Sequence, residues 1–202
     1  MEDLRTVYNE FALTYEKNRN MFDMSKIIED LSKNIKKEHK KVLDLGCGAG
    51  EPFAKHFLEK GFDVTGVDFS EKMLKQAEKF VPSMKRIHQD MRKVEFNDNN
   101  FDIILAIYSI FHLNNEEQMQ LLKRIYGWLK KDGILLFTYA TKEYTEREEF
   151  EGYKNFMGKN LFYAHKTPQY IKEYLLSLGF FEVSFKYREI GGETFLWITV
   201  KK

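Results

Sequence analysis

The sequence predicts an α/β fold with a doubly wound, mostly parallel sheet and helices on both of its faces. Short apolar runs alternate along the chain with longer segments of helical periodicity, as in folds whose parallel strands are joined by crossover helices. A glycine-rich turn follows the first apolar run without a break. The fourth run, residues 101–108, is almost continuously apolar, which is typical of a central parallel strand covered on both faces.

The individual elements follow in the order that this fold requires. The first strand ends in the glycine turn, and Pro52 behind that turn suits the start of the next helix. Asp63 opens a second buried run, after which Ser70 begins a segment with apolar residues at helical spacing. Gly179 stops a late helix and leads into a strand. Strands are expected near 41–45, 63–67, 84–88, 101–108, 133–139, 181–188 and 194–200, and helices near 3–17, 25–37, 51–60, 71–79, 115–129 and 168–178.

The composition indicates one globular domain that spans residues 1–202. Hydrophobic residues make up 43% of the chain, only three residues are proline, and the formal net charge is +1. The single cysteine excludes an internal disulfide, and the polar opening at residues 1–5 does not resemble a signal peptide, so we expect a cytoplasmic location. No apolar run is long enough for a membrane span. No cluster of His, Cys, Asp and Glu has metal-ligand spacing, so no metal is expected.

A lysine-rich run at residues 33–41 raises the question of nucleic acid binding. The run precedes the first strand, away from the sheet edge that carries the glycine turn, and Glu38 interrupts it. No aromatic residue alternates with the lysines, and the charge of the whole chain is nearly balanced. A solvated helix end explains the run better, so no nucleic acid partner is expected.

The glycine turn narrows the choice of cofactor. Gly46, Gly48 and Gly50 allow the main chain to turn sharply and to approach a ligand closely. A dinucleotide-binding turn has its third glycine beside the pyrophosphate, whereas Glu51 occupies that place here and would repel a pyrophosphate. This disfavours a nicotinamide oxidoreductase. The Walker pattern of nucleoside triphosphate sites is absent from the chain.

With Asp44 two residues before it, the turn resembles motif I of the class I S-adenosylmethionine-dependent methyltransferases. The ligand of this family carries a sulfonium and an ammonium, with which nearby carboxylates are electrostatically compatible. The resemblance is clear over residues 1–139 and covers the rest of the chain in outline. It implies a Rossmann-like sheet of seven strands, the last of them antiparallel, which matches the glycine pair 191–192 between the final two strands.

Two acidic residues after later strands extend this resemblance. Asp68 ends the second strand about twenty residues past the turn, where an acid accepts hydrogen bonds from the ribose hydroxyls. Alternatively, Asp68 only caps the following helix. The resemblance implies that Asp90, after the third strand, binds the adenine amino group and that Met91 packs on the adenine ring. Asp90 could instead be an exposed loop acid.

The end of the fourth strand lies where this family builds its methyl-acceptor site. Enzymes that methylate exocyclic amino groups of bases or glutamine amides usually carry Asn/Asp-Pro-Pro-Tyr there, whereas residues 107–112 are Ile-Tyr-Ser-Ile-Phe-His. The only cysteine, Cys47, lies in the cofactor turn, so the nucleophile that activates cytosine C5 is missing. Both nucleic acid chemistries are therefore disfavoured.

The N-terminal segment, residues 1–24, is expected to form a lid helix. Tyr8, Ala12 and Tyr15 match a Tyr-x-x-x-Ala-x-x-Tyr pattern that resembles the lead-in of small-molecule methyltransferases. The resemblance implies that Tyr15 covers the methionine end of the cofactor and that Arg19 pairs with its carboxylate. The alternative is a helix whose aromatic residues only pack on the sheet.

Residues 141–165 form a long connection after the fifth strand, and we expect them to form a substrate cap. Connections of this length are usually functional or disordered, and the density of aromatic residues argues against disorder. Each aromatic residue could instead complete the core. The predicted substrate-binding residues are Tyr108, His112, Phe162, Tyr163 and His165.

The expected function is S-adenosylmethionine-dependent methyl transfer to a small-molecule acceptor, with S-adenosylhomocysteine as product. Tyr108, His112 and His165 are the candidate catalytic residues, although only some acceptors need a general base, and His112 could be a structural residue at a helix entry. An RNA or protein methyltransferase and a catalytically silent cofactor-binding protein remain alternatives. The predicted cofactor-binding residues are Tyr15, Arg19, Asp44, Gly46, Cys47, Gly48, Gly50, Asp68, Phe69, Met73, Asp90, Met91 and Ile107.

Overall fold

The computed structural model describes residues 4–18, 23–156 and 158–202, without the side chains of residues 14–18, 182 and 183. The strands are β1 (Lys41–Leu45), β2 (Asp63–Asp68), β3 (Lys85–His88), β4 (Phe101–Ala106), β5 (Leu129–Tyr139), β6 (Phe150–Phe156), β7 (Lys159–His165), β8 (Phe181–Ile190) and β9 (Glu193–Lys201). The helices are α1 (Leu4–Asn18), α2 (Ser25–Ser32), α3 (Phe53–Glu59), α4 (Glu71–Phe80), the 3-10 turn η1 (Ile110–His112), α5 (Asn115–Trp128), α6 (Lys142–Thr145) and α7 (Pro168–Leu178).

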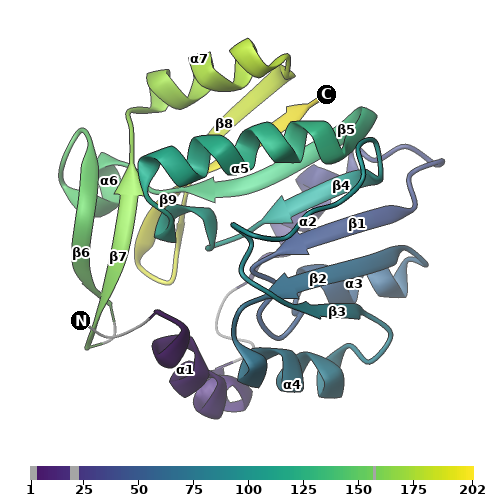
Figure 1. Cartoon of the computed structure of the whole chain (residues 1–202), viewed down its shortest axis with the longest axis horizontal. Coiled ribbons are helices and arrows are strands. Elements are labelled where there is room, and N and C mark those ends of the chain that lie inside the picture. Colours follow the sequence, from purple (N-terminus) through teal and green to yellow (C-terminus); the bar gives the residue numbers. More distant parts are fainter. Residues whose placement is uncertain (1–3, 19–22, 157) are drawn as a thin grey trace.

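Seven of the described strands form one sheet in the order β3-β2-β1-β4-β5-β9-β8 (Figure 1). The pairs from β3 to β5 are all parallel, whereas β9 runs antiparallel to both β5 and β8. The chain turns from β8 into β9 at the glycine pair 191–192, as the sequence predicts. The predicted fold class, with its last strand antiparallel, is confirmed.

Helices cover both faces of this sheet and enclose two hydrophobic cores. On one face α5 and α7 pack on the strands through Leu121, Leu122, Ile125, Ile171 and Leu175. On the other face α2, α3 and α4 do so through Ile27, Leu31, Phe53, Phe57, Leu74 and Ala77. Of the described helices, none combines the length and the apolar character that a membrane crossing requires.

The helix boundaries follow from local capping chemistry. Ser70 begins α4, since its Oγ accepts from the Met73 N–H at 3.1 Å. Asn114 and Glu117 form a reciprocal capping box at the start of α5. Gly179 ends α7 with a φ of 101°, a left-handed conformation that favours glycine.

Several predicted boundaries differ from the structure. The helix expected at 25–37 ends at residue 32, the helix expected to start at 51 starts at 53, and β5 starts four residues before 133. The strand expected to reach residue 108 ends at Ala106, because Tyr108 adopts a φ of 51° and its N–H donates to Thr138 Oγ1 at 2.6 Å. This turn lifts the chain off the sheet and into η1.

The connection at 141–165 contains more regular structure than the sequence indicates. It forms α6 and the antiparallel hairpin β6-β7. In β6, exposed residues alternate with half-buried ones, and none is fully buried. The strand therefore lacks the strong alternation of apolar and polar residues on which strand prediction depends.

The hairpin β6-β7 and helix α1 lie on the side toward which the parallel strands point (Figure 1). Helix α1 is joined to α4 by Asn9, whose Oδ1 accepts from Ser70 Oγ at 2.7 Å. It is joined to the hairpin by an ion pair between Glu10 and Lys159 at 2.9 Å and by the rings of Phe11 and Phe156, whose centroids are 6.0 Å apart. The carboxyl edge of the sheet is therefore covered by two segments from distant parts of the chain.

Candidate functional site

The glycines of the turn after β1 allow the main chain to turn sharply, as the sequence predicts, and at Gly46 the chain lies close to a neighbouring residue. Gly46 has a φ of 75°, and a Cβ built on it would lie 2.5 Å from the Cβ of Ser109. Gly48 has a φ of 51°, but a Cβ there would meet no described protein atom within 4 Å. Gly46 is thus required by internal packing, whereas Gly48 leaves its backbone open to a ligand.

Asp68 joins this turn to the end of β2. Its Oδ2 accepts from the Gly48 N–H at 2.8 Å, and its Oδ1 accepts from the Ser70 N–H at 2.7 Å. Burial raises the pKa of Asp68, and these backbone hydrogen bonds oppose the shift. Ser70, not Asp68, is the N-cap residue of α4, and the role of Asp68 in binding the ribose stays a prediction.

Asp44 places a second buried carboxyl beside the turn. Burial, assisted by the charge of Asp68, raises the pKa of Asp44 to about 7. Asp102, at the opposite edge of the sheet, shows the contrasting case. Burial also acts on it, but the N–H groups of Lys40 and Lys41 and the ammonium of Lys130 donate to its carboxylate, and its pKa falls below the ordinary value. Asp44 and Asp68 therefore form a site in which a cation would be stabilised.

Asp90 and Met91 lie on the loop after β3. Met91 is buried, and its Cε would lie 3.3 Å from a Cβ built on Gly46, so the side chain reaches the glycine turn. Asp90 is half-buried, and Arg92 donates to both of its carboxylate oxygens. Although burial acts in the opposite direction, these bonds lower the pKa of Asp90. The predicted pair is thus on the same side of the sheet as the turn.

Of the other predicted cofactor-binding side chains, four are described and two are not. Phe69, Met73 and Ile107 follow β2 or β4 near the turn, with Phe69 and Ile107 partly exposed and Met73 buried. The thiol of Cys47 points inward, since its sulfur would lie 2.7 Å from a Cβ on Gly66, and burial raises its pKa well above the ordinary value. The side chain of Tyr15 and the whole of Arg19 lie outside the described residues, so their roles stay predictions.

On the acceptor side, His112 is held by two segments from elsewhere in the chain. Its Nε2 lies 2.9 Å from the hydroxyl of Tyr8 on α1, and its Nδ1 lies 2.8 Å from the carbonyl oxygen of Phe162 on β7. Because a carbonyl only accepts, Nδ1 carries the proton and Tyr8 donates to Nε2. Burial lowers the pKa of His112 to about 4, so the ring is neutral at physiological pH.

This buried histidine makes the stability of the protein sensitive to acid. Between about pH 6.5 and pH 4 the unfolded chain binds a proton at His112 that the folded protein does not. The free energy of unfolding should therefore fall as the pH falls through this window, by about 3 kcal/mol from this residue.

Denaturant titrations of the wild type and of His112→Gln across this pH range measure the effect. The variant should lose the part of the pH dependence that comes from the uptake of one proton by the unfolded chain. Equal pH dependence in the wild type and His112→Gln would contradict the assignment of a neutral, buried His112.

Tyr163 lies against His112 in a group of four tyrosines that we call the tyrosine cluster: Tyr8, Tyr108, Tyr144 and Tyr163. The ring centroids of Tyr163 and His112 are 4.8 Å apart, and those of Tyr163 and Tyr144 are 5.1 Å apart. Burial raises the pKa of each of the four hydroxyls. These phenols are therefore protonated and able to donate hydrogen bonds at neutral pH.

Tyr8 links this cluster to the cofactor turn. Its ring centroid is 5.9 Å from that of Phe69, which follows Asp68, and 5.8 Å from that of His112. After burial, the charge of Asp68 is the largest influence that raises the pKa of Tyr8. The two halves of the predicted site are thus adjacent.

The structure does not bring His165 or the ring of Phe162 into the same group. His165 is fully buried, with its Nε2 2.6 Å from Thr145 Oγ1 and its Nδ1 3.2 Å from the carbonyl oxygen of Lys166. The ring of Phe162 packs on the exposed ring of Tyr153, with centroids 5.5 Å apart. The ring of Phe162 thus packs within the hairpin, whereas His165 joins the hairpin to α6.

Three residues at or beside the tyrosine cluster had no role predicted from the sequence. Tyr8 belongs to the quoted N-terminal aromatic pattern, so that signal could have indicated it. Tyr144 lies in the aromatic-rich connection, which gave a weaker indication. Glu193 has no signal in the sequence, because only the packing of α6 on β9 brings it near Tyr144.

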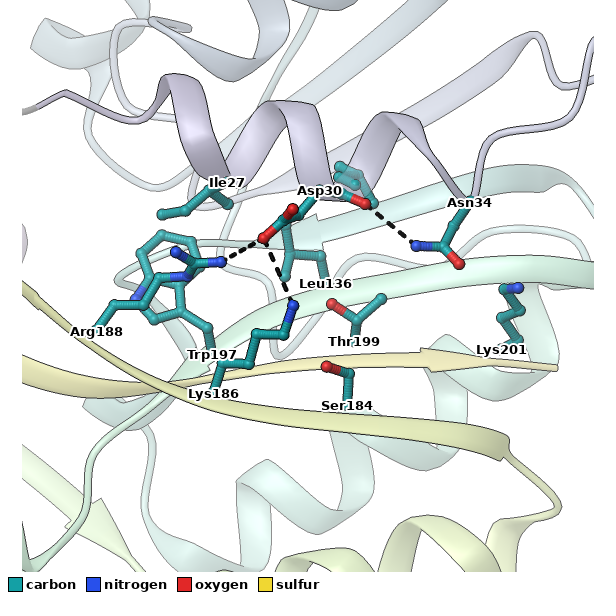
Figure 2. A pocket seen from close by; sticks show the side chains of 11 residues that line it. Ile27, Asp30, Asn34, Leu136, Ser184, Lys186, Arg188, Trp197, Thr199 and Lys201 are labelled. Carbon is teal, nitrogen blue, oxygen red and sulfur yellow. Dashed lines mark hydrogen bonds and ion pairs between the residues drawn. The ribbon is translucent and has the colours of Figure 1, made fainter.

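A cavity of about 250 Å³ lies elsewhere, between α2 and the strands β8 and β9 (Figure 2). Figure 2 shows Asp30 of α2 directed toward Arg188 and Lys186, at 2.6 Å and 3.5 Å. Its lining residues are Ile27, Asp30, Leu31, Asn34, Leu136, Ser184, Lys186, Arg188, Trp197, Thr199 and Lys201, which are different from those predicted for the site. The ion pairs across the cavity join α2 to the C-terminal hairpin.

Comparison with known proteins gives matches over the half of the chain that contains the turn. Residues 42–133 match the family model described as methyltransferase domain. The YqeM protein of Bacillus subtilis is 39% identical over 105 residues, which are 50% of this chain and 42% of that protein. Phosphoethanolamine N-methyltransferase of Plasmodium falciparum is 31% identical over 148 residues, 71% of this chain and 54% of that enzyme. The chain thus spans about half the length of these curated relatives.

A solved structure extends the likeness of the fold to nearly the whole chain. The 1,6-didemethyltoxoflavin-N1-methyltransferase of Burkholderia thailandensis, solved with 1,6-didemethyltoxoflavin and S-adenosylhomocysteine, superposes with a TM-score of 0.66 at 20% identity over 97% of this chain and 87% of that chain. At this identity the likeness shows the fold alone. The confirmed fold, the glycine turn and the match of residues 42–133 to the methyltransferase domain model together support the class I S-adenosylmethionine-dependent methyltransferase family for this chain.

Proposed function

We propose that this chain transfers a methyl group from S-adenosylmethionine to a small-molecule acceptor. The observation that carries the proposal is the turn at Gly48, whose backbone is open to a ligand between two buried carboxyls. Asp44 and Asp68 have raised pKa values because of their burial, and a bound cation would favour their charged forms. The residues present therefore fit a cationic nucleoside better than a phosphate-bearing one.

The residues proposed to bind the cofactor lie on or beside separate loops. Asp68 would accept from the ribose hydroxyls, Asp90 from the adenine amino group, and Met91 would pack on the adenine ring. Asp90 can take this role while Arg92 holds it, since each carboxylate oxygen has more than one lone pair. When bound, S-adenosylmethionine supplies an electrophilic methyl group on a sulfonium.

On the acceptor side the protein has to align the acceptor and exclude water. The tyrosine cluster supplies buried aromatic area at the edge where β4 ends, and α1 and the hairpin cover it. His112 is neutral, and its Nε2 lone pair is held by the Tyr8 hydroxyl. We therefore propose a relay, in which the Tyr8 hydroxyl oxygen takes the proton from an acceptor that carries one while the hydroxyl's own proton passes to His112 Nε2.

A small molecule is favoured as acceptor because these acceptor-side groups are buried aromatic rings. A long basic or peptide-sized surface, as an RNA or protein substrate needs, would have to display charge in the same place. The name of one relative, phosphoethanolamine N-methyltransferase, supports the same choice.

The proposal is tested by donor binding and by a donor-dependent homocysteine-release assay. Calorimetry should show that S-adenosylmethionine and S-adenosylhomocysteine bind, and turnover is expected with members of a metabolite panel. Turnover with RNA or protein substrates alone would contradict the small-molecule assignment. A chain that binds the donor and turns over no substrate of any class would be the catalytically silent alternative.

A further inference from the structure

Glu193 lies beside the tyrosine cluster. It begins β9 and is two residues from Phe195, so both side chains leave the same face of the strand. The Phe195 ring is buried, with its centroid 4.5 Å from that of Tyr144 and 5.3 Å from that of Tyr108. Glu193 itself is partly exposed. A carboxylate therefore lies on the same face of β9 as a group of buried aromatic rings.

Tyrosine rings lead from His112 to this carboxylate. The ring centroids of Tyr163 and Tyr144 are 5.1 Å apart, and α6, which carries Tyr144, packs on β9, which begins at Glu193. Burial raises the pKa of Glu193, and the nearby hydroxyl of Tyr144 and the charge of Lys154 oppose this shift. The charge of Glu193 also raises the pKa of Tyr8 and of Tyr108, after the larger effect of burial. The charge of Glu193 thus acts on tyrosines that lie between the hairpin and the cofactor turn.

An ammonium group of the protein already lies at this place. Lys154, on β6 of the hairpin, has its Nζ 5.0 Å from the centroid of the Tyr144 ring. It is also the cation whose charge acts on Glu193. Aromatic faces and a carboxylate together attract a cation more strongly than either alone, since a partly buried site screens the charges less than water does. The arrangement shows which kind of group this site accommodates.

We propose that Glu193 and Tyr144 bind the ammonium group of an amine acceptor, which takes the place of Lys154. This inference rests on the proposed methyltransferase function and names the substrate class for it. An ammonium has no lone pair, so one N–H bond must break before the nitrogen can react. For this class of acceptor the proton passes to a Glu193 carboxylate oxygen rather than to the Tyr8–His112 pair, and the electron pair stays on the nitrogen.

The test compares n-alkylamines, from ethylamine to hexylamine, with the alcohols of the same chain length. Calorimetry on the full chain saturated with S-adenosylhomocysteine should show that the best amine binds at least about tenfold more tightly than its matched alcohol. Glu193→Gln keeps the size of the side chain and should remove this preference. Lys154→Met removes the competing ammonium and should strengthen amine binding by several fold.

Two exposed residues provide matched controls. Glu59→Gln on α3 and Lys172→Met on α7 make the same chemical changes away from the cluster and should leave the preference for amines unchanged. Amines and alcohols that bind equally, or that both fail to bind, would overturn the proposal. So would a Glu193→Gln variant that keeps the preference. Binding of S-adenosylhomocysteine, measured in the same proteins, reports separately on the proposed methyltransferase function.

Discussion

Asp68→Ala is expected to weaken the binding of S-adenosylhomocysteine by more than about 100-fold. In our proposal the carboxylate accepts two hydrogen bonds from the ribose, and a bond to a charged acceptor contributes about 1.5–3 kcal/mol. The substitution also removes the acceptor of the Gly48 and Ser70 N–H groups, which hold the turn and the start of α4 together. Calorimetry measures the loss of affinity directly.

Asp63→Ala is the matched control for this experiment. Asp63 is the exposed first residue of the same strand, at the opposite edge of the sheet, so its loss should leave affinity within about a factor of two of the wild type. A folded Asp68→Ala variant with wild-type affinity would show that the cofactor ribose does not lie at the end of β2.

Two alanine substitutions in the turn should separate folding from binding. Gly46→Ala places a Cβ 2.5 Å from the Cβ of Ser109, at a φ of 75° that disfavours alanine, and should lower the free energy of unfolding by about 2–4 kcal/mol. Gly48→Ala meets no described protein atom within 4 Å and should cost about 1 kcal/mol for its positive φ. Its methyl group nevertheless enters the space proposed for the cofactor, so binding should be lost.

Thermal unfolding and calorimetry on the two variants provide the measurements. The expected result is a destabilised Gly46→Ala protein and a stable Gly48→Ala protein that no longer binds S-adenosylhomocysteine. Gly61→Ala, on the loop before β2, is a suitable control, since this residue also has a positive φ and open space around its Cβ direction. If Gly48→Ala binds like the Gly61→Ala control, then the open side of the turn does not face the cofactor.

The role proposed for α1 depends on its position between the two halves of the site. Asn9 attaches it to the start of α4, and Tyr8 contacts both Phe69 and His112. Glu10 and Phe11 attach it to the hairpin. A ligand at the turn and an acceptor at the tyrosine cluster would therefore contact the same helix. That α1 and the 141–165 segment form a lid and a cap over these ligands remains our proposal.

The sequence by itself determined the fold and the position of the cofactor turn. The positions of the strands could be predicted because burial on both faces makes β1, β2 and β4 short and mostly apolar runs, a local property of the chain. The turn could be predicted because its glycines adopt positive φ values within one short segment. Asp44 and Asp68 could be placed because the carboxyl ends of neighbouring parallel strands meet at one edge.

Only the tertiary structure decided the acceptor side. Tyr8 and His112 are 104 residues apart along the chain, and Glu193 lies near Tyr144 because α6 packs on β9. Such contacts depend on how whole segments dock, which local periodicity does not encode. His165 and Tyr163 are two residues apart with similar aromatic surroundings, yet packing directs one toward Thr145 and the other toward His112. Sequence spacing places both on one face of β7, and only the docked hairpin determines which of them reaches the cluster.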